Sequence, residues 1–113
     1  MNIKIDTLER YLYERYGGWA KEEALFLKLV EEIGEVAEII NMRTGAKKAK
    51  EVDLKRELGL ELADMIHYVV AIAAVNGIDL TGIMLEKDRA GSLKYGHKIN
   101  LETFITKEEK GGE

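Results

Sequence analysis

The chain has 113 residues, a formal net charge of −4, and neither cysteine nor proline. An acidic chain lacks the basic face that binds a nucleic-acid polymer, and the absence of cysteine excludes disulfides, thiolate metal sites and a cysteine nucleophile. Hydrophobic residues make up 46% and charged residues 34%, which excludes a disordered chain and is typical of a helical one. The length predicts a single domain over residues 1–113.

The first residues, Met1 to Asp6, lack the apolar core of a signal peptide, and no apolar run reaches the roughly 20 residues that span a bilayer. We therefore expect a soluble, cytoplasmic protein with no membrane partner. A chain of this length buries a modest core by itself, so partner subunits are expected to supply part of it.

The apolar periodicity is helical almost throughout, and no alternation is long enough to predict a sheet. A first helix is predicted within about residues 1–18, capped by Asp6 or Thr7 and ended by Gly17-Gly18. A second helix is predicted over about residues 20–42. Its apolar stripe consists of Leu25, Leu29, Ile33, Val36 and Ile40.

A third helix is predicted over about residues 52–75, and its second half, 65–75, is apolar nearly all round. Such a stretch must be buried in a subunit interface or at the centre of a bundle. A fourth helix starts at Asp79 or Thr81 and runs to about Tyr95, and about residues 104–113 are expected to form a flexible tail. The sequence predicts an all-α, four-helix bundle-like subunit completed by homo-oligomerisation.

Two short acidic runs lie on the second and third predicted helices. At about 100° per residue, Glu32 and Glu35 stand one turn apart, and so do Glu61 and Asp64. Two such helices packed antiparallel would aim these carboxylates into one small volume, where like charges repel unless cations lie between them. Hard oxygen ligands suit Mg²⁺ or Mn²⁺, not zinc.

The segment from Leu29 to Glu38, followed by Glu61-Leu62-Ala63-Asp64, resembles the signature of the MazG-like nucleoside triphosphate pyrophosphohydrolases. These belong to the all-α NTP pyrophosphatase superfamily, with the dCTP pyrophosphatases and dimeric dUTPases. The resemblance implies a homo-oligomer, dimer or tetramer, that hydrolyses an NTP or dNTP to the monophosphate and pyrophosphate with Mg²⁺. It also implies site residues: Glu32, Glu35, Glu61 and Asp64 as metal ligands, and Glu31 and Glu38 as outer acids that bind a second metal or orient the catalytic water.

Four further residues are candidates for binding substrate. Trp19 and Tyr68 match places where dCTP pyrophosphatase relatives carry aromatics, and base stacking tolerates any base. The alternative is that both are core or interface aromatics. Lys87 and Arg89 are candidate triphosphate contacts. Asp88 stands where the family is expected to have Asn, and a solvated helix face is the alternative for the basic residues.

Asp64 and His67 form an Asp-x-x-His pair, but di-iron carboxylate bundles need Glu-x-x-His units on two helices. A packing or interface histidine is therefore the favoured interpretation. Two alternatives to the enzyme remain: a non-enzymatic helical metal-binding or assembly module, and a di-iron carboxylate bundle. The sequence leaves open the preferred base and sugar, and whether the role is house-cleaning of aberrant nucleotides or control of a normal pool.

Overall fold

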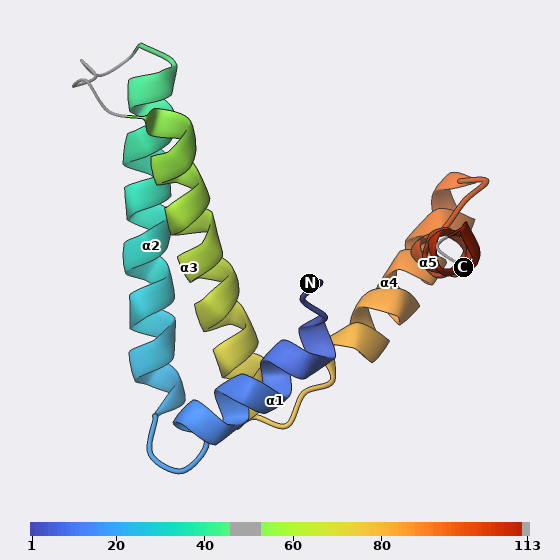
Figure 1. The fold of residues 1–113 in the computed structure, drawn as a ribbon, viewed down its shortest axis with the longest axis horizontal. Coiled ribbons are helices and arrows are strands. Elements are labelled where there is room, and N and C mark those ends of the chain that lie inside the picture. The colour runs from blue at the N-terminus through green and yellow to red at the C-terminus, as the bar shows by residue number, and fades with distance from the viewer. Residues whose placement is uncertain (46–52, 112–113) are drawn as a thin grey trace. The chain divides into compact units, whose positions relative to one another are not determined.

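In the computed structural model, residues 1–45 and 53–111 are described, and all regular structure in them is helical (Figure 1). The helices are α1 (Ile5–Tyr16), α2 (Glu22–Arg43), α3 (Leu54–Val75), α4 (Leu80–Tyr95) and α5 (Leu101–Gly111). The predicted all-α class is confirmed, with five helices in these ranges where four were expected. The predicted start of the third helix at residue 52 lies outside the described residues, as does the end of the tail at 112–113.

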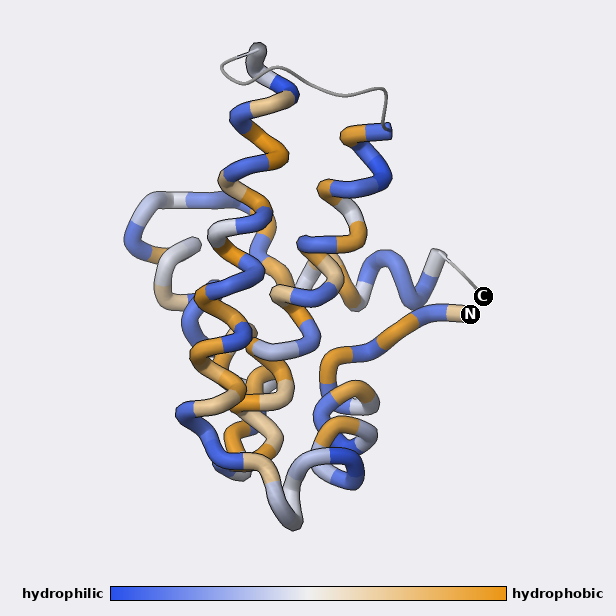
Figure 2. The backbone as a smooth tube through the Cα atoms, turned by 90° about the vertical axis from the view of Figure 1, so that its left-hand side faces the viewer, coloured by the Kyte–Doolittle hydropathy of each residue, from blue (hydrophilic) through white to orange (hydrophobic). Residues whose placement is uncertain are grey.

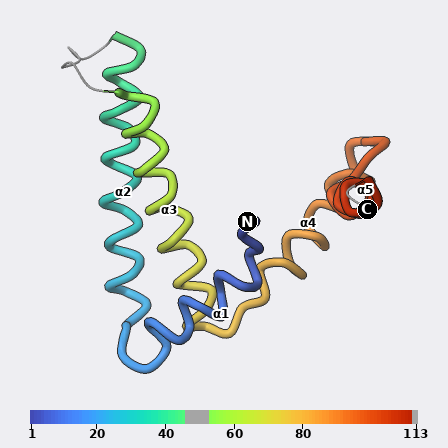
Figure 3. Tube along the Cα trace, in the orientation of Figure 1, coloured from blue at the N-terminus to red at the C-terminus, as the bar shows by residue number. Residues whose placement is uncertain are grey.

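The chain divides into two compact units, Met1–Ile78 and Asp79–Glu113. The first contains α1, α2 and α3, and the second contains α4 and α5. In the first unit, α2 and α3 pack together along their length, and α1 packs on α3. The chain trace in Figure 3 shows α3 returning antiparallel to α2. This antiparallel pair is the frame on which the acidic runs lie.

The core of the first unit lies where α1 meets α3. The side chains that are almost fully buried are Leu12, Tyr16, Leu25, Val70, Ala71, Ala73 and Ala74. Four of them belong to the second half of α3, where three small alanines let neighbouring helices approach closely. The core is thus concentrated beyond the acidic turn of α3, toward its C-terminal end.

The stretch 65–75, expected to be buried all round, is buried on one side only within this chain. Val70 and Ala71 are buried, whereas Ile66 is 56% and Val69 is 43% exposed. Figure 2 shows polar and apolar residues alternating along the helices. By length and hydropathy alone α3 is able to cross a membrane, a property that the core helix of a soluble protein also shows. This corrects the expectation that no apolar run is long enough.

Two predicted helix starts had different outcomes. Helix α1 begins at Ile5 after an extended Lys4, so the predicted cap at Asp6 or Thr7 is wrong. Asp6 instead lies in the first turn, where its charge favours the positive end of the helix. Asp79 is confirmed as the N-cap of α4, because its Oδ1 accepts a hydrogen bond from the Gly82 N–H at 3.2 Å.

Helix α5 covers residues 101–111, so most of the range predicted as a flexible tail has a helical conformation that the sequence analysis did not predict. The helix starts with a reciprocal cap: Asn100 Oδ1 accepts from the Thr103 N–H at 2.9 Å, and Thr103 Oγ1 accepts from the Asn100 N–H at 3.1 Å. Such a cap satisfies backbone groups that a helix start leaves open. The charged, glycine-containing end of the chain concealed this signal.

Candidate metal centre and adjoining aromatic pocket

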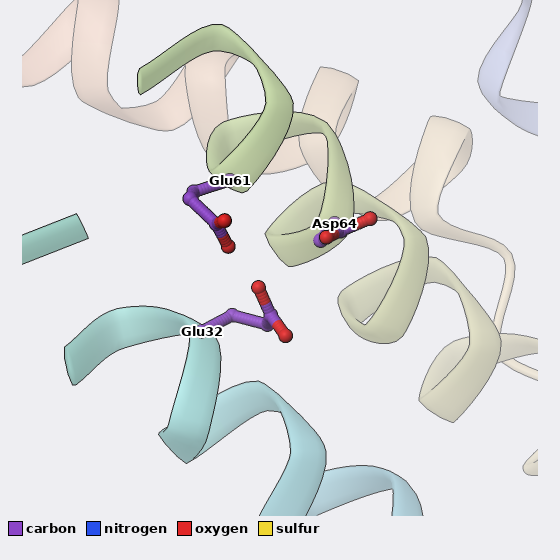
Figure 4. Close-up of side chains that lie close together, drawn as sticks. All are labelled: Glu32, Glu61 and Asp64. Atoms are coloured by element: carbon purple, nitrogen blue, oxygen red, sulfur yellow. The ribbon is translucent and has the colours of Figure 1, made fainter. Parts of the chain in front are cut away.

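Three carboxylates meet between α2 and α3. Glu32, Glu61 and Asp64 each offer one oxygen, and these oxygens all lie within 4.8 Å of one another. Glu32 on α2 and Glu61 on α3 reach toward each other, with Asp64 one turn further along α3 (Figure 4). They meet because the antiparallel packing brings the acidic turn of each helix opposite the other. We call these three residues the carboxylate cluster.

Two oxygens of the carboxylate cluster are buried without a hydrogen-bond donor. Glu32 and Glu61 are half-buried, whereas Asp64 is exposed. Oε2 of Glu32 and Oε2 of Glu61 are both inaccessible and have no hydrogen-bond partner. A buried, unpaired carboxylate oxygen is costly unless a donor or a cation compensates it. The donor set, oxygen only, suits a hard divalent cation.

The cluster perturbs the acidity of Glu61. Its pKa is raised from 4.5 to about 8. The largest cause is that protonation would let Glu61 donate a hydrogen bond to Glu32, the next is the same possibility toward Glu35, and burial and the charges of both neighbours add to the shift. Glu35 is therefore a fourth acid within reach of Glu61. A bound cation would act in the opposite direction, because it favours the ionised carboxylate.

The acids predicted from the sequence thus fall into two groups. Glu32, Glu61 and Asp64 form the cluster, and Glu35 interacts with it through Glu61. Among the described residues, Glu31 and Glu38 are not part of this three-residue group. Both are exposed on α2. The Glu31 carboxylate instead lies 3.4 Å from the ammonium of Lys28. The roles assigned to all six acids stay predictions.

A pocket of about 400 Å³ is lined in part by residues of α2 and α3 that stand one helical turn from the cluster. Its lining residues are Tyr16, Trp19, Ala20, Lys21, Ala24, Leu25, Lys28 and Tyr68. Trp19 and Tyr68, from a loop and from α3, line the same hollow. Tyr68 lies one helical turn beyond Asp64, and Lys28 lies one turn before Glu32. We call this hollow the aromatic pocket.

Of the residues that line the pocket, the sequence singles out only Trp19 and Tyr68 as a binding site; Tyr16, Lys21 and Lys28 are among those it misses. For Lys28 a signal existed, since it stands four residues before Glu32 and so on the same helix face. No comparable signal marked Tyr16, because its neighbour in the fold, His67, lies far away along the chain.

His67 is not part of the carboxylate cluster in the described chain. Its Nε2 lies 2.7 Å from the hydroxyl of buried Tyr16. Burial, and after it the positive charge of Arg15, lowers the pKa of His67. These contacts agree with the packing interpretation of this histidine and leave the di-iron alternative without its histidine ligand.

The basic residues of α4 belong to the second unit. Arg89 forms an ion pair with Glu102 of α5, and Asp88 Oδ2 accepts a hydrogen bond from the Leu101 N–H at 2.6 Å. Arg89 and Asp88 therefore connect α4 to α5. Lys87 makes no hydrogen bond or ion pair with any described residue.

The fold and the site define an all-helical protein with a carboxylate centre between two antiparallel helices. Residues 20–87 match the MazG nucleotide pyrophosphohydrolase domain. This range contains α2, α3 and half of α4, and so both acidic runs. The chain belongs to the MazG family, and the resemblance seen in the sequence is confirmed.

Two relatives support the assignment. The crystal structure of iMazG from Vibrio DAT 722 is similar with a TM-score of 0.63 and 30% sequence identity, over 82% of this chain and 98% of that one. The uncharacterized protein YpjD of Bacillus subtilis strain 168 is 28% identical over 102 residues, which are 90% of this chain and 80% of YpjD. The similarity thus extends over most of the chain.

Proposed function

We propose that this protein is a Mg²⁺-dependent nucleoside triphosphate pyrophosphohydrolase. It cleaves an NTP or dNTP between the α- and β-phosphates and releases the monophosphate and pyrophosphate. The observation that carries the proposal is the carboxylate cluster, with two buried oxygens that have no donor, in a member of the MazG family. Unpaired carboxylates brought together destabilise the folded state. Such destabilising groups are concentrated at functional sites, and a cation-dependent reaction requires these carboxylates.

Glu32, Glu61 and Asp64, together with Glu35, would hold the cation. Bound there, Mg²⁺ or Mn²⁺ would neutralise charge on the phosphate oxygens and make a bound water more acidic. We assign Glu31 and Glu38 the role of orienting the attacking water or accepting its proton. Their exposure on α2 supports this role, because such a group must reach solvent.

The aromatic pocket would hold the base. Trp19 is 73% exposed and so presents most of its ring for stacking, and Tyr68 faces the same hollow. Lys21 and Lys28 add positive charge at the pocket, where an anionic nucleotide would enter. Stacking tolerates every base, so this arrangement selects nucleotides as a class and not one base.

Lys87 and Arg89 remain candidate contacts for the β- and γ-phosphates. The lack of any partner for Lys87 among the described residues supports its candidacy. Arg89 would have to exchange its ion pair with Glu102 for a phosphate. Phosphate binding by a lysine needs only a point charge, whereas arginine binds it in a bidentate geometry.

We further propose that the protein works as a homo-oligomer, a dimer or a tetramer. The support is a set of large apolar side chains on α2 and α3 that this chain leaves exposed. They are Phe26, Leu27, Val30, Ile33, Ile40, Leu60, Leu62, Ile66 and Val69. A surface this apolar is typical of a protein interface. Light scattering at micromolar concentration is expected to give a multiple of 12.8 kDa, and a monomer mass would contradict the proposal.

A nucleotide panel tests the proposed activity directly. Canonical and modified NTPs and dNTPs are incubated with the protein and Mg²⁺, Mn²⁺ or EDTA, and monophosphate and pyrophosphate are both quantified. We expect equal amounts of the two products with at least one nucleotide and none with EDTA. Release of inorganic phosphate in place of pyrophosphate would refute the cleavage site. No hydrolysis with either metal would favour a metal-binding or assembly module, and bound iron would favour the di-iron bundle.

A further inference from the structure

A hydrogen bond joins the end of α1 to the middle of α3. The Tyr16 hydroxyl lies 2.7 Å from His67 Nε2, and the two rings meet edge to face with centroids 5.6 Å apart. Tyr16 is only 8% exposed, and His67 is half-buried. Each polar group satisfies the other in a place that water reaches poorly, so removal of one leaves the other unpaired.

Each residue of this pair contacts one aromatic of the proposed base site. The Trp19 ring centroid is 5.6 Å from that of Tyr16, and the Tyr68 centroid is 5.0 Å from that of His67. Trp19, Tyr16, His67 and Tyr68 therefore form one continuous row of rings. Tyr16 also lines the aromatic pocket together with Trp19 and Tyr68.

The position of Trp19 depends on the end of α1. Trp19 follows Gly17 and Gly18, which restrict the backbone little. Its indole N–H donates to the Arg15 carbonyl at 2.7 Å, and its ring contacts Tyr16. Both contacts are to the last residues of α1. Tyr16 in turn attaches this end of α1 to α3 through His67.

Helix α3 links this row of rings to the carboxylate cluster. His67 and Tyr68 stand three and four residues after Asp64 on the same helix. At about 1.5 Å of rise per residue, one rigid turn of roughly 5 Å along the axis separates them. A group attached to His67 therefore has a defined position relative to the carboxylates.

We propose that Tyr16 and His67 are positioning residues that hold Trp19 and the aromatic pocket at a fixed distance from the carboxylate cluster. A nucleotide stacked in the pocket then presents its α-phosphate to the cluster. The inference rests on the proposed function and extends it to residues outside the acidic motif. A pocket held in this way is already ordered before the nucleotide arrives, so loosening it makes binding pay the cost of ordering and weakens the affinity.

Steady-state kinetics with the best nucleotide of the panel, at saturating Mg²⁺, test the pair. Tyr16→Phe removes the hydroxyl and keeps the ring, and His67→Leu removes the partner. Each is expected to lower kcat/KM about tenfold, mainly through KM. The double variant should lose no more than about the larger single loss, since both changes break the same bond. His67→Gln offers an amide near the place of Nε2 and should restore part of the affinity.

Tyr13→Phe is the matched control, because Tyr13 lies one turn earlier on α1 and is 58% exposed. It should leave KM unchanged. Melting temperatures are measured for every variant, and assays are run well below the lowest of them. An unchanged KM in Tyr16→Phe, an equal rise in Tyr13→Phe, or additive losses in the double variant would overturn the inference.

Fluorescence separates this inference from the proposed function. Trp19 is the single tryptophan of the chain, so the tryptophan fluorescence of the protein reports on the mobility of this side chain. In the nucleotide-free protein, Tyr16→Phe should lower the anisotropy of Trp19 and increase its quenching by acrylamide, whereas Tyr13→Phe should do neither. A wild-type protein that hydrolyses no nucleotide refutes the function. Wild-type hydrolysis with unchanged KM and fluorescence in Tyr16→Phe refutes the positioning pair alone.

Discussion

Two groups of carboxylates, one in each compact unit, are compensated to different degrees. In the second unit, Glu102 pairs with Arg89, and Asp88 accepts a hydrogen bond from the Leu101 N–H that begins α5. In the first unit, Glu32 and Glu61 face each other, and each has a buried oxygen with no donor. The acids of the second unit thus stabilise the fold that contains them. The Oε2 atoms of Glu32 and Glu61 in the carboxylate cluster have no such donor, whereas Glu31 in the same unit pairs with Lys28.

Whether a carboxylate has a donor or a cation from the chain distinguishes structural acids from functional ones better than its position on a helix does. A helix bears many glutamates at little cost while they face water. The cost appears when packing places two of them opposite each other, as the raised pKa of Glu61 records. The carboxylate cluster and the acids that connect α4 to α5 therefore predict opposite signs for the same kind of substitution: neutralisation should stabilise the metal-free protein in the cluster and destabilise it between α4 and α5.

The largest effect is expected on hydrolysis. Glu61→Gln, Glu35→Gln and Asp64→Asn each remove a ligand charge and nearly preserve shape, and each should lower Mg²⁺-dependent hydrolysis at least about a hundredfold. The metal-free protein should stay as stable or become more stable, since a repulsion is removed. Turnover and melting temperature with and without Mg²⁺ check both points.

Glu57→Gln is the matched control for these substitutions, because Glu57 is exposed on α3 one turn before Glu61. It should retain turnover. Full Mg²⁺-dependent turnover in Glu35→Gln would show that the fourth acid is no ligand, and the same result in Glu61→Gln would remove the metal centre altogether.

A smaller effect is expected in the aromatic pocket. Stacking on an aromatic ring contributes about 1–3 kcal/mol per base, so Trp19→Ala should raise KM about tenfold and lower kcat less. Trp19→Phe keeps a stacking surface, so its KM should lie between that of the wild type and that of Trp19→Ala. Nucleotide binding should also quench the fluorescence of wild-type Trp19. If kcat falls while KM stays constant, Trp19 acts on the chemistry or on the fold and not on the base.

The carboxylate cluster should make stability depend on pH when no metal is bound. The pKa of Glu61 is raised from 4.5 to about 8 on folding, so the folded state binds a proton that the unfolded state has released. Its contribution to stability is therefore present at low pH and is lost as pH rises through this interval. The denaturant concentration at the unfolding midpoint of the metal-free protein should therefore decrease as the pH is raised from 4.5 to about 8.

Two controls identify the source of that dependence. Saturating Mg²⁺ should raise the midpoint most at the alkaline end, because the cation binds the ionised cluster of the native state. Glu61→Gln should flatten the pH profile of the metal-free protein. A wild-type profile equally flat with and without Mg²⁺ would mean that the cluster does not bind the cation.

The smallest effect is expected in the second unit. Asp88→Ala leaves the Leu101 N–H without its acceptor and should lower stability by about 1 kcal/mol. Asp88→Asn keeps an acceptor oxygen and should cost less. Neither variant should change the increase in melting temperature that Mg²⁺ produces. Stabilisation by Asp88→Ala would contradict the contrast between the two units.

The helical class, the approximate bounds of α2, α3 and α4, and the acidic runs were all predictable from the sequence. Each is a local property: periodicity, glycine ends and caps such as Asp79 act over a few residues. Where a local signal was weak, prediction failed, as at the cap of α1 and at Asn100 before α5.

Only the tertiary structure decided which acids meet and what lies beside them. Six glutamates and aspartates were candidates, and the rotation of α2 against α3 brings Glu32, Glu61 and Asp64 together while Glu31 turns to Lys28. The contact of Tyr16 with His67 depends on where α1 packs on α3. Helix periodicity specifies the face on which a side chain lies, but the partner it meets depends on packing between segments distant in the chain.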